Sequence, residues 1–341
     1  MDTKNLRVAI NGFGRVGRLF FRQVYSEPRR TTASIDIVAI NDLSDAKNLA
    51  YLLKYDTVYR TWDRDVDALL KNIQFLQEKD PTKLPWKDLN IDVVVEATGL
   101  FESFEKNRAH LQAGAKRVVI SAPAKDDEQA DAQTILLGVN DDQLKNCKIV
   151  ATGSCTTNAT HPIAQILLES VGVKKAVLNT IHAYTGTQSI VDSISTKDFR
   201  RGRAAAMNII PATSGVTISV VRAIKELAGK FDGLAMRVPV ATGSIVDFTF
   251  VAGRATSVDE INNIFRQAAQ DPRWKNILTV VEDPIVSSDV IGMPYSAIVD
   301  LSFTKVVDGD LVKVFSWYDN EWGYVNTLVQ HVEKISNLLY E

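Results

Sequence analysis

The stretch LRVAINGFGRVGRLFFRQVY, residues 6–25, determines the fold of the first half of the chain. Residues 6–10 are an apolar, β-branched run that is typical of a buried strand. The run leads through a G-x-G-x-x-G pattern, Gly12 to Gly17, into a helical stretch, which is the order that a dinucleotide-binding unit requires. We therefore expect a parallel sheet whose first helix points its N-terminus at a pyrophosphate.

The three glycines of this turn have separate predicted roles. Gly12 permits the tight turn, Gly14 lets the backbone approach the pyrophosphate, and Gly17 lets helix and strand pack closely. The second predicted strand, residues 35–40, is followed by Asp42, which can accept hydrogen bonds from an adenosine ribose. Its charge would repel a 2′-phosphate, so the pattern favours NAD over NADP. The alternative is a glycine turn followed by a solvated aspartate.

Short apolar runs alternate with helical stretches through the rest of the first half, which indicates a parallel sheet covered on both faces. Thr98, Gly99 and Ser121 follow two of these runs, at the strand ends where such sheets bind ligands. Each could equally be a turn residue that ends a strand. The further runs are residues 92–97, 117–121, 134–139 and 148–151.

From residue 176 onward, longer alternating strands are typical of a mostly antiparallel sheet with one helical layer. An apolar stripe from Val325 to Leu339 predicts a final helix that docks on a core. The predicted fold class is therefore α/β, with a Rossmann-type NAD-binding domain over residues 1–153 and an α+β catalytic domain over residues 154–318. The C-terminal helix, 319–341, returns to the first domain and completes it.

Composition excludes several function classes. The chain has 39 Lys and Arg against 41 Asp and Glu, a net charge of -2, so we expect no nucleic-acid or anionic-membrane partner. No apolar run reaches the ~18 residues that a membrane span needs, and the N-terminal residues contain no signal-peptide core. We expect a cytoplasmic protein, whose two cysteines, Cys147 and Cys155, do not form a disulfide framework.

Cys155 lies at a second predicted junction between a strand and a helix, in the segment GSCTTN. Helix amides and the positive end of the helix dipole would lower the pKa of a thiol there and favour the nucleophilic thiolate. Pro162 could kink this helix or delay its start. The alternative is that Cys155 is a small buried hydrophobic residue.

His182 is the candidate base for this nucleophile, near the end of the alternating strand VLNTIHAYT. An imidazole beside a thiolate can take the proton of a hemithioacetal hydroxyl while hydride leaves for a nicotinamide ring. The other histidines, His110, His161 and His331, have helical or cap-like surroundings and are interpreted as structural or exposed. They show no metal-ligand spacing, so no metal is expected.

Arginines supply candidate phosphate ligands, because guanidinium groups match phosphate oxygens. Arg237 lies inside a predicted strand, where a charge needs an explanation, and Arg200, Arg201 and Arg203 lie in a polar segment. A phosphorylated aldehyde follows as the expected substrate. The alternative for the three clustered arginines is a solvated or subunit-facing charge run. Nearby hydroxyl and amide candidates are Thr185, Thr187, Ser214 and Gly215.

A series of segments in this order resembles phosphorylating glyceraldehyde-3-phosphate dehydrogenase over essentially the whole chain. The most specific combination is SCTTN, 154–158, followed by HAYT, 182–185, and WYDNEWGY, 317–324. The remaining segments are INGFGRVGR, INDLSDAKNLAYLLKYDTV, DPTKLPW, VVVEATG, RRGRAAAMNIIP and RVPV.

The resemblance implies Cys155 as nucleophile and His182 as base in the NAD- and phosphate-dependent oxidation of glyceraldehyde 3-phosphate to 1,3-bisphosphoglycerate. Inorganic phosphate would attack the Cys155 thioester before water does. The implied cofactor-binding residues are Gly12, Phe13, Gly14, Arg15, Val16, Gly17, Asp42, Lys79, Thr98, Gly99 and Ser121, with Asn320 and Tyr324 beside the nicotinamide. The implied substrate- and phosphate-binding residues are Ser154, Thr156, Thr185, Thr187, Arg200, Ser214, Gly215 and Arg237.

The resemblance also implies a homotetramer. Some use of NADP remains open, because Ser193-Ile194-Ser195 lacks the proline common in NAD-specific members. Two other functions stay open as well. One is a paralogue that acts on erythrose 4-phosphate or releases the acid by hydrolysis, and the other is a non-catalytic NAD-binding or interaction protein.

Overall fold

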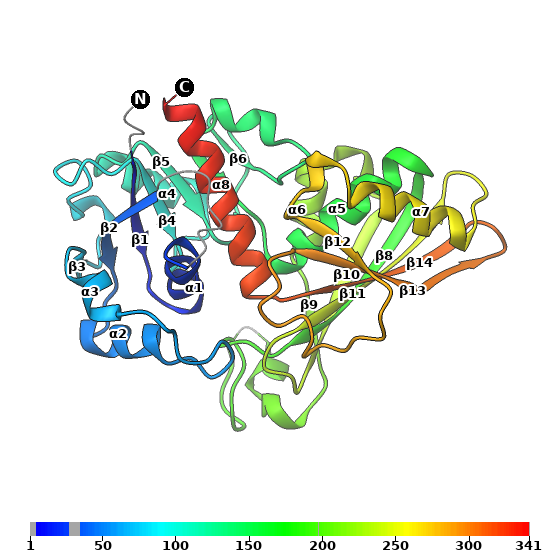
Figure 1. The fold of residues 1–341 in the computed structure, drawn as a ribbon, viewed down its shortest axis with the longest axis horizontal. Coiled ribbons are helices and arrows are strands. Elements are labelled where there is room, and N and C mark those ends of the chain that lie inside the picture. The colour runs from blue at the N-terminus through cyan, green and yellow to red at the C-terminus, as the bar shows by residue number, and fades with distance from the viewer. Residues whose placement is uncertain (1–4, 27–34, 197, 341) are drawn as a thin grey trace. The chain divides into compact units, whose positions relative to one another are not determined.

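A computed structural model of the chain describes residues 5–26, 35–196 and 198–340, and the chain divides into two compact units (Figure 1). The first unit comprises the described residues up to Gly153 together with those from Val325 onward. The second unit comprises the described residues of Ser154–Tyr324. Each unit contains its own seven-stranded sheet.

The sheet of the first unit is entirely parallel, as predicted for this half of the chain. Its strands are β1 (Leu6–Asn11), β2 (Ile35–Asn41), β3 (Gln74–Leu76), β4 (Val93–Glu96), β5 (Arg117–Ile120), β6 (Ala132–Thr134) and β7 (Ile149–Ala151). They lie in the order β3-β2-β1-β4-β5-β7-β6. The strand order reverses between β1 and β4, and such a reversal is where open α/β sheets bind ligands.

One predicted strand is largely wrong. The run at 134–139 is strand only at Thr134, the last residue of β6, and turns follow it. The Asn140 side chain accepts from the Leu136 amide at 2.8 Å and donates to the Thr134 carbonyl at 2.9 Å, so it binds backbone groups that a strand would use. Leu136 is fully buried, so the apolar run reflects burial without strand geometry.

In the described ranges of the chain, five α-helices accompany the first sheet: α1 (Arg15–Val24), α2 (Ala46–Lys54), α3 (Val66–Leu70), α4 (Phe104–Gln112) and α8 (Trp322–Tyr340). The buried face of α8 docks on the first unit, where His331 Nε2 lies 3.0 Å from the Ile135 carbonyl oxygen. The last helix therefore returns to the first unit, as the fold class predicts, although it begins at Trp322 and not at residue 319.

The sheet of the second unit is mostly antiparallel, as predicted, with two parallel pairs. Its strands are β8 (Val173–Ala183), β9 (Ile210–Thr213), β10 (Phe231–Val238), β11 (Ser244–Ala252), β12 (Leu278–Val281), β13 (Ala297–Val307) and β14 (Leu311–Tyr318). Burial alternates along β11, so one face of the sheet is buried. Helices pack on it: α5 (Cys155–Ser170), α6 (Val216–Ala223) and α7 (Val258–Ala268).

Helix α5 begins at Cys155, and Pro162 lies inside it without delaying its start. Ser154 is the N-cap: its Oγ accepts from the Thr157 amide, and Thr157 Oγ1 accepts from the Ser154 amide, each at 3.1 Å. This reciprocal capping box satisfies two amide donors of the first turn. The backbone around Cys155 is therefore fixed by its own sequence.

Among the described residues, no helix combines the length and apolar character that a membrane crossing needs.

Candidate functional site

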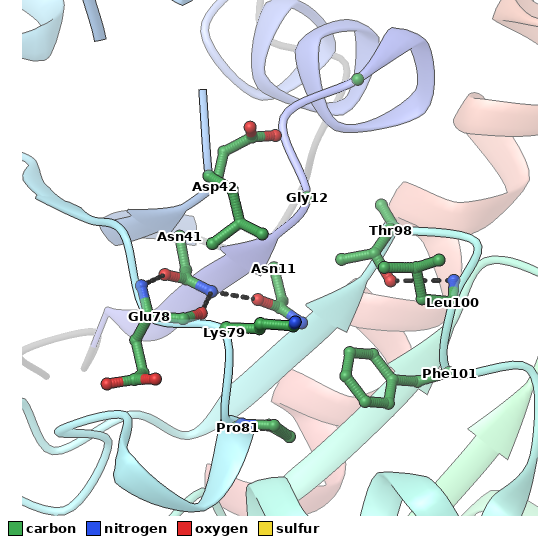
Figure 2. Close-up of a pocket in the computed structure, with 13 residues that line it drawn as sticks. Asn11, Gly12, Asn41, Asp42, Glu78, Lys79, Pro81, Thr98, Leu100 and Phe101 are labelled. Carbon is green, nitrogen blue, oxygen red and sulfur yellow. Dashed lines mark hydrogen bonds between the residues drawn. The ribbon is translucent and has the colours of Figure 1, made fainter. Parts of the chain in front are cut away.

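A cavity of about 360 Å³ opens in the first unit at the carboxyl ends of β1, β2 and β4 (Figure 2). It lies where the strand order reverses, the position predicted for a dinucleotide. Predicted cofactor residues in its lining are Gly12, Gly14, Asp42, Lys79 and Thr98. Further lining residues, which the sequence interpretation did not select as ligands, include Asn11, Asn41, Glu78, Leu100 and Phe101.

The glycines of the first turn have the geometry that their predicted roles need. Gly12 has a φ of +93°, and a Cβ there would lie 2.6 Å from the Thr98 backbone nitrogen. A Cβ on Gly17 would lie 2.2 Å from the Gly12 carbonyl oxygen, so helix and turn are in closest contact at this point. At Gly14 no atom lies within 4 Å of a Cβ position, so space for a ligand remains beside its backbone.

Asp42 is held beside this turn by backbone groups. One carboxylate oxygen accepts from the Phe13 amide at 2.8 Å and the other from the Ser44 amide at 2.9 Å. The Phe13 ring itself is fully buried and makes an edge contact with Phe21, so only its backbone faces the turn. The Asp42 carboxylate is therefore oriented in advance, with lone pairs left for hydroxyl donors.

The Arg15 side chain contacts residues outside the lining of the cavity. Its guanidinium forms an ion pair with Asp56, and its Cζ lies 5.6 Å from the centre of the Tyr59 ring. The lining of the described cavity accordingly does not include the Arg15 side chain. Other predicted cofactor residues of the first unit that lie outside this lining are Phe13, Val16, Gly17, Gly99 and Ser121.

Cys155 and His182 are brought together in the second unit, with Sγ 3.3 Å from Nε2. Cys155 is the first residue of α5 and is half-buried, whereas His182, near the end of β8, is 1% exposed. This distance permits transfer of a proton between sulfur and imidazole. The two candidate residues that the sequence analysis paired therefore form one site.

The other ring nitrogen of His182 has two neighbours. Its Nδ1 lies 2.7 Å from the Ala183 carbonyl oxygen and 2.7 Å from Nη1 of Arg237. A protonated Nδ1 donates to the carbonyl and leaves a lone pair on Nε2 facing the sulfur, whereas an unprotonated Nδ1 accepts from Arg237. Burial, together with the positive charge of Arg237, lowers the pKa of His182 to about 3, so the ring is neutral near pH 7.

Burial raises the pKa of the Cys155 thiol, while the positive charge of Arg237 and hydrogen bonds from Thr156 lower it less. The predicted depression of this pKa by the helix N-terminus is therefore wrong. The sulfur lies at the start of α5 as expected, but the loss of hydration outweighs the favourable helix amides.

Tyr318 lies beside Cys155 and His182, and the sequence analysis did not select it as a site residue. Its hydroxyl lies 3.1 Å from Thr156 Oγ1 and 2.8 Å from Thr180 Oγ1, and its ring makes an edge contact with the His182 ring at 5.8 Å between centres. Burial raises the pKa of Tyr318 above its ordinary value, so the phenol stays neutral. The Thr156 side chain, a predicted phosphate ligand, is thus buried and engaged with Tyr318.

The remaining residues predicted to bind phosphate each contact different neighbours. Thr185 Oγ1 and Thr187 Oγ1 are 2.9 Å apart, and Thr187 is exposed whereas Thr185 is half-buried. Arg200 is paired with Asp198 at 3.1 Å, which fits the alternative of a solvated charge run. Ser214 Oγ accepts from the Val216 amide at 3.3 Å, and Gly215 precedes the first residue of α6. Of the predicted phosphate-binding arginines, Arg237 alone contacts the site of Cys155 and His182 in the described structure.

The two predicted nicotinamide neighbours are buried in the second unit. Asn320 Oδ1 accepts from Ser244 Oγ at 2.9 Å and from the Gly243 amide at 3.1 Å, and Ser244 Oγ in turn accepts from the Ala183 amide at 3.1 Å. This chain of bonds connects Asn320 to the residue after His182. Tyr324 is 5% exposed. In the described part of the chain, no group of His, Cys, Asp and Glu side chains is arranged to hold a metal ion.

Comparison with known proteins gives matches along nearly the whole chain. Residues 6–104 match the model of the NAD-binding domain of glyceraldehyde 3-phosphate dehydrogenase, and residues 154–320 match the model of its C-terminal domain. A glyceraldehyde-3-phosphate dehydrogenase of Thermotoga maritima is 47% identical over 335 residues, covering 96% of this chain and 98% of the relative. Those of Mycobacterium tuberculosis and Streptomyces coelicolor are 45% and 44% identical, each covering 98% of this chain and 99% of the relative.

Proposed function

Because this chain belongs to the glyceraldehyde-3-phosphate dehydrogenase family, we propose that it oxidises glyceraldehyde 3-phosphate with NAD and inorganic phosphate to 1,3-bisphosphoglycerate. The observation that carries the proposal is the 3.3 Å distance between Cys155 Sγ and His182 Nε2. Nucleophile and base at this distance are what thioester chemistry on an aldehyde requires.

The cavity of the first unit fits an NAD adenosine and pyrophosphate. Gly14 leaves open space beside its backbone, α1 has no acidic residue in its first turn, and Asp42 can accept from ribose hydroxyls. We assign adenosine and pyrophosphate binding to Gly12, Gly14 and Asp42, with Lys79 and Thr98 beside them. Asn320 and Tyr324 are assigned to the nicotinamide, which supplies a hydride acceptor when NAD is bound.

In the first step, Cys155 Sγ attacks the aldehyde carbon, and the thiol proton passes through His182 Nε2 to the carbonyl oxygen. A neutral His182 with its proton on Nδ1 can receive that proton, because the lone pair of Nε2 then faces the sulfur. The product is a hemithioacetal on Cys155. This route needs no preformed thiolate, which agrees with the raised pKa of the Cys155 thiol.

In the second step, His182 Nε2 takes the hydroxyl proton of the hemithioacetal while the carbon gives up its hydride, and a thioester remains. Inorganic phosphate then attacks the thioester carbon and the C–S bond breaks, and the departing sulfur takes back the proton held on His182 Nε2, 3.3 Å away, so that thiol and neutral imidazole are both restored. We assign the substrate phosphate to Arg237, Thr185 and Thr187. The attacking phosphate is assigned to Arg200, Ser214 and Gly215, with Ser154 and Thr156 nearest the nucleophile.

The test is NAD reduction with glyceraldehyde 3-phosphate, with and without inorganic phosphate. We expect phosphate-dependent NADH formation that is lost in Cys155→Ser and kept in Cys147→Ser, since Cys147 is the other, fully buried cysteine. Erythrose 4-phosphate in parallel tests the paralogue, and NADH formation independent of phosphate would indicate hydrolysis. NADH formation by Cys155→Ser at the parental rate would refute the proposal.

We also propose a homotetramer. Large apolar side chains are exposed on the second unit around residues 190–209, among them Ile190 at 87%, Ile194 at 94% and Phe199 at 85%. Such side chains are typical of surfaces that another subunit covers. Light scattering during size-exclusion chromatography should give four times the chain mass of 37.7 kDa, and a mass of 37.7 kDa would contradict the tetramer.

We propose a cytoplasmic location, without nucleic-acid or membrane partners. Both cysteines are free, which suits a reducing compartment, and the net charge of -2 offers no general attraction to polyanions. Cell fractionation and a binding assay with DNA at low salt would test this.

A further inference from the structure

Glu96 is a buried carboxylate at the point where the strand order of the first sheet reverses. It is the last residue of β4, it is 2% exposed, and its register partner on β1 is Asn11. Asn11 lines the cavity of the first unit and Glu96 does not. A buried charge at such a position requires donors that compensate for its lost hydration.

Glu96 has four such donors on two sides. One carboxylate oxygen accepts from Asn11 Nδ2 at 2.6 Å and lies 3.2 Å from His110 Nε2. The other accepts from the Thr98 amide at 2.8 Å and from the Thr98 hydroxyl. The carboxylate therefore connects the end of β1 with the segment after β4, which form two walls of the cavity.

His110 is fixed as a donor to Glu96 by a third buried residue. The Trp86 indole N–H, which can only donate, lies 3.0 Å from His110 Nδ1. Nδ1 must therefore accept, and the proton of a neutral His110 resides on Nε2, facing Glu96. Both His110 and Trp86 are fully buried. The orientation of the Glu96 carboxylate is thus set from the core, outside the cavity.

The contacts continue from Glu96 to the cavity lining. Asn11 Oδ1 accepts from Asn41 Nδ2 at 2.7 Å, and Asn41 is bonded to the Glu78 backbone through both its amide oxygen and nitrogen (Figure 2). On the other wall, Thr98 Oγ1 accepts from the Leu100 amide at 3.1 Å. Since a Cβ on Gly12 would meet the Thr98 nitrogen, the turn and this segment are in direct contact, and a shift of one must move the other.

We propose that Glu96 is a positioning residue for the dinucleotide. It holds the turn at Gly12 and the segment 98–101 at the spacing that the cofactor needs, and it does so without touching the cofactor. This inference rests on the proposed function, because it takes NAD as the ligand of the cavity. Its consequence is that NAD affinity depends on a buried acceptor outside the binding surface.

The decisive variant is Glu96→Gln. An amide has one acceptor oxygen, so with that oxygen toward Thr98 its NH₂ group faces the donors of Asn11 and His110. Asn11 can relieve this only by rotating, which breaks its bond with Asn41. We expect the Kd for NAD, measured by calorimetry, to rise about tenfold.

Asp92→Asn is the matched control. Asp92 is likewise 2% exposed, and it directly precedes the opposite end of β4, where it accepts from the Arg7 amide at 2.9 Å and from Lys116 Nζ at 2.7 Å. It undergoes the same change from carboxylate to amide, far along the strand from the cavity. We expect a lower Tm but a Kd for NAD within about twofold of the parent.

An unchanged Kd in Glu96→Gln, or an equal rise in both variants, would overturn the inference, because Glu96 would then act only on stability. If Glu96→Gln does not fold, Glu96→Asp retains the charge on a shorter side chain and should raise the Kd about threefold. Failure of the parent to bind NAD would overturn the proposed function as well, so the parental titration separates the two. Iodoacetamide labelling of Cys155 without NAD should be parental in both variants, since that residue belongs to the second unit.

Discussion

Arg237 Nη1 lies 2.7 Å from His182 Nδ1, and the two residues are register partners on β10 and β8. The guanidinium competes with the Ala183 carbonyl for this nitrogen, since Nδ1 can accept from one or donate to the other. It also places a positive charge beside the site of Cys155. One arginine therefore affects both the protonation of the imidazole and the ionisation of the thiol.

Replacing Arg237 with Leu should make the thiol harder to ionise. The positive charge of Arg237 opposes the rise that burial causes in the pKa of Cys155. Without it, we expect the midpoint of the pH dependence of iodoacetamide labelling to move up by about one pH unit. Arg201→Leu is the control, as a neighbouring arginine without a hydrogen bond to His182 in the described structure. An unchanged midpoint in Arg237→Leu would show that the guanidinium has no effect on the sulfur.

His182 should make the stability of the second unit depend on pH. Its pKa of about 3 in the folded protein is below the 6.5 of an unperturbed imidazole, so the unfolded state binds more protons between these values. The contribution of His182 to the unfolding free energy is complete above about pH 6.5. It is lost as the pH falls toward 3, at up to about 1.4 kcal/mol per pH unit. Urea unfolding at a series of pH values from 7 to 5 gives the unfolding free energy as a function of pH. This free energy should fall less steeply with falling pH in His182→Gln than in the parent, and equal pH dependence in both proteins would exclude the effect.

Tyr318→Phe should remove the hydroxyl that bridges Thr156 and Thr180 while the ring stays beside His182. We expect a loss of about 1 kcal/mol in unfolding free energy, together with slower NADH formation in a single turnover, because Thr156 adjoins the nucleophile. The affinity for NAD should not change. Stability loss without any kinetic effect would mean that the phenol supports the fold alone.

Asp42→Asn should relax the choice between the two nicotinamide cofactors. The substitution preserves an oxygen for the Phe13 amide, which Asp42 binds at 2.8 Å, and removes the charge that repels a 2′-phosphate. We expect the affinity for NADP to rise and the affinity for NAD to fall, each by about threefold, as measured by calorimetry. Ser44→Ala, two residues further along the loop, serves as the control. A variant that binds NADP no better than the parent would remove Asp42 from the specificity determinants.

The parts of the fold that could be predicted from the sequence are those in which a single local pattern determines a single helix or strand. The apolar run and glycine pattern predicted β1 and the start of α1, and GSCTTN predicted the junction at Cys155. The run at 134–139 failed because the Asn140 side chain competes for its backbone groups, an effect that periodicity does not report.

Long-range relationships were out of reach of such patterns. That Arg237 faces His182 depends on the pairing of β8 with β10, and that Glu96 meets both Asn11 and His110 depends on three separate elements. Tyr318 lay inside a quoted motif, but no local signal directs its hydroxyl toward Thr156 and Thr180. A polar residue that ends a buried strand, as Asn11 and Glu96 do, was the available clue.

The capping box that precedes Cys155 has a kinetic consequence. Because Ser154 and Thr157 satisfy each other's amides, the nucleophile occupies its position before any substrate arrives. The entropy of ordering that segment is therefore lost once, when the chain folds, and not again in every turnover. A loosened cap would slow acylation even if the sulfur itself were unchanged.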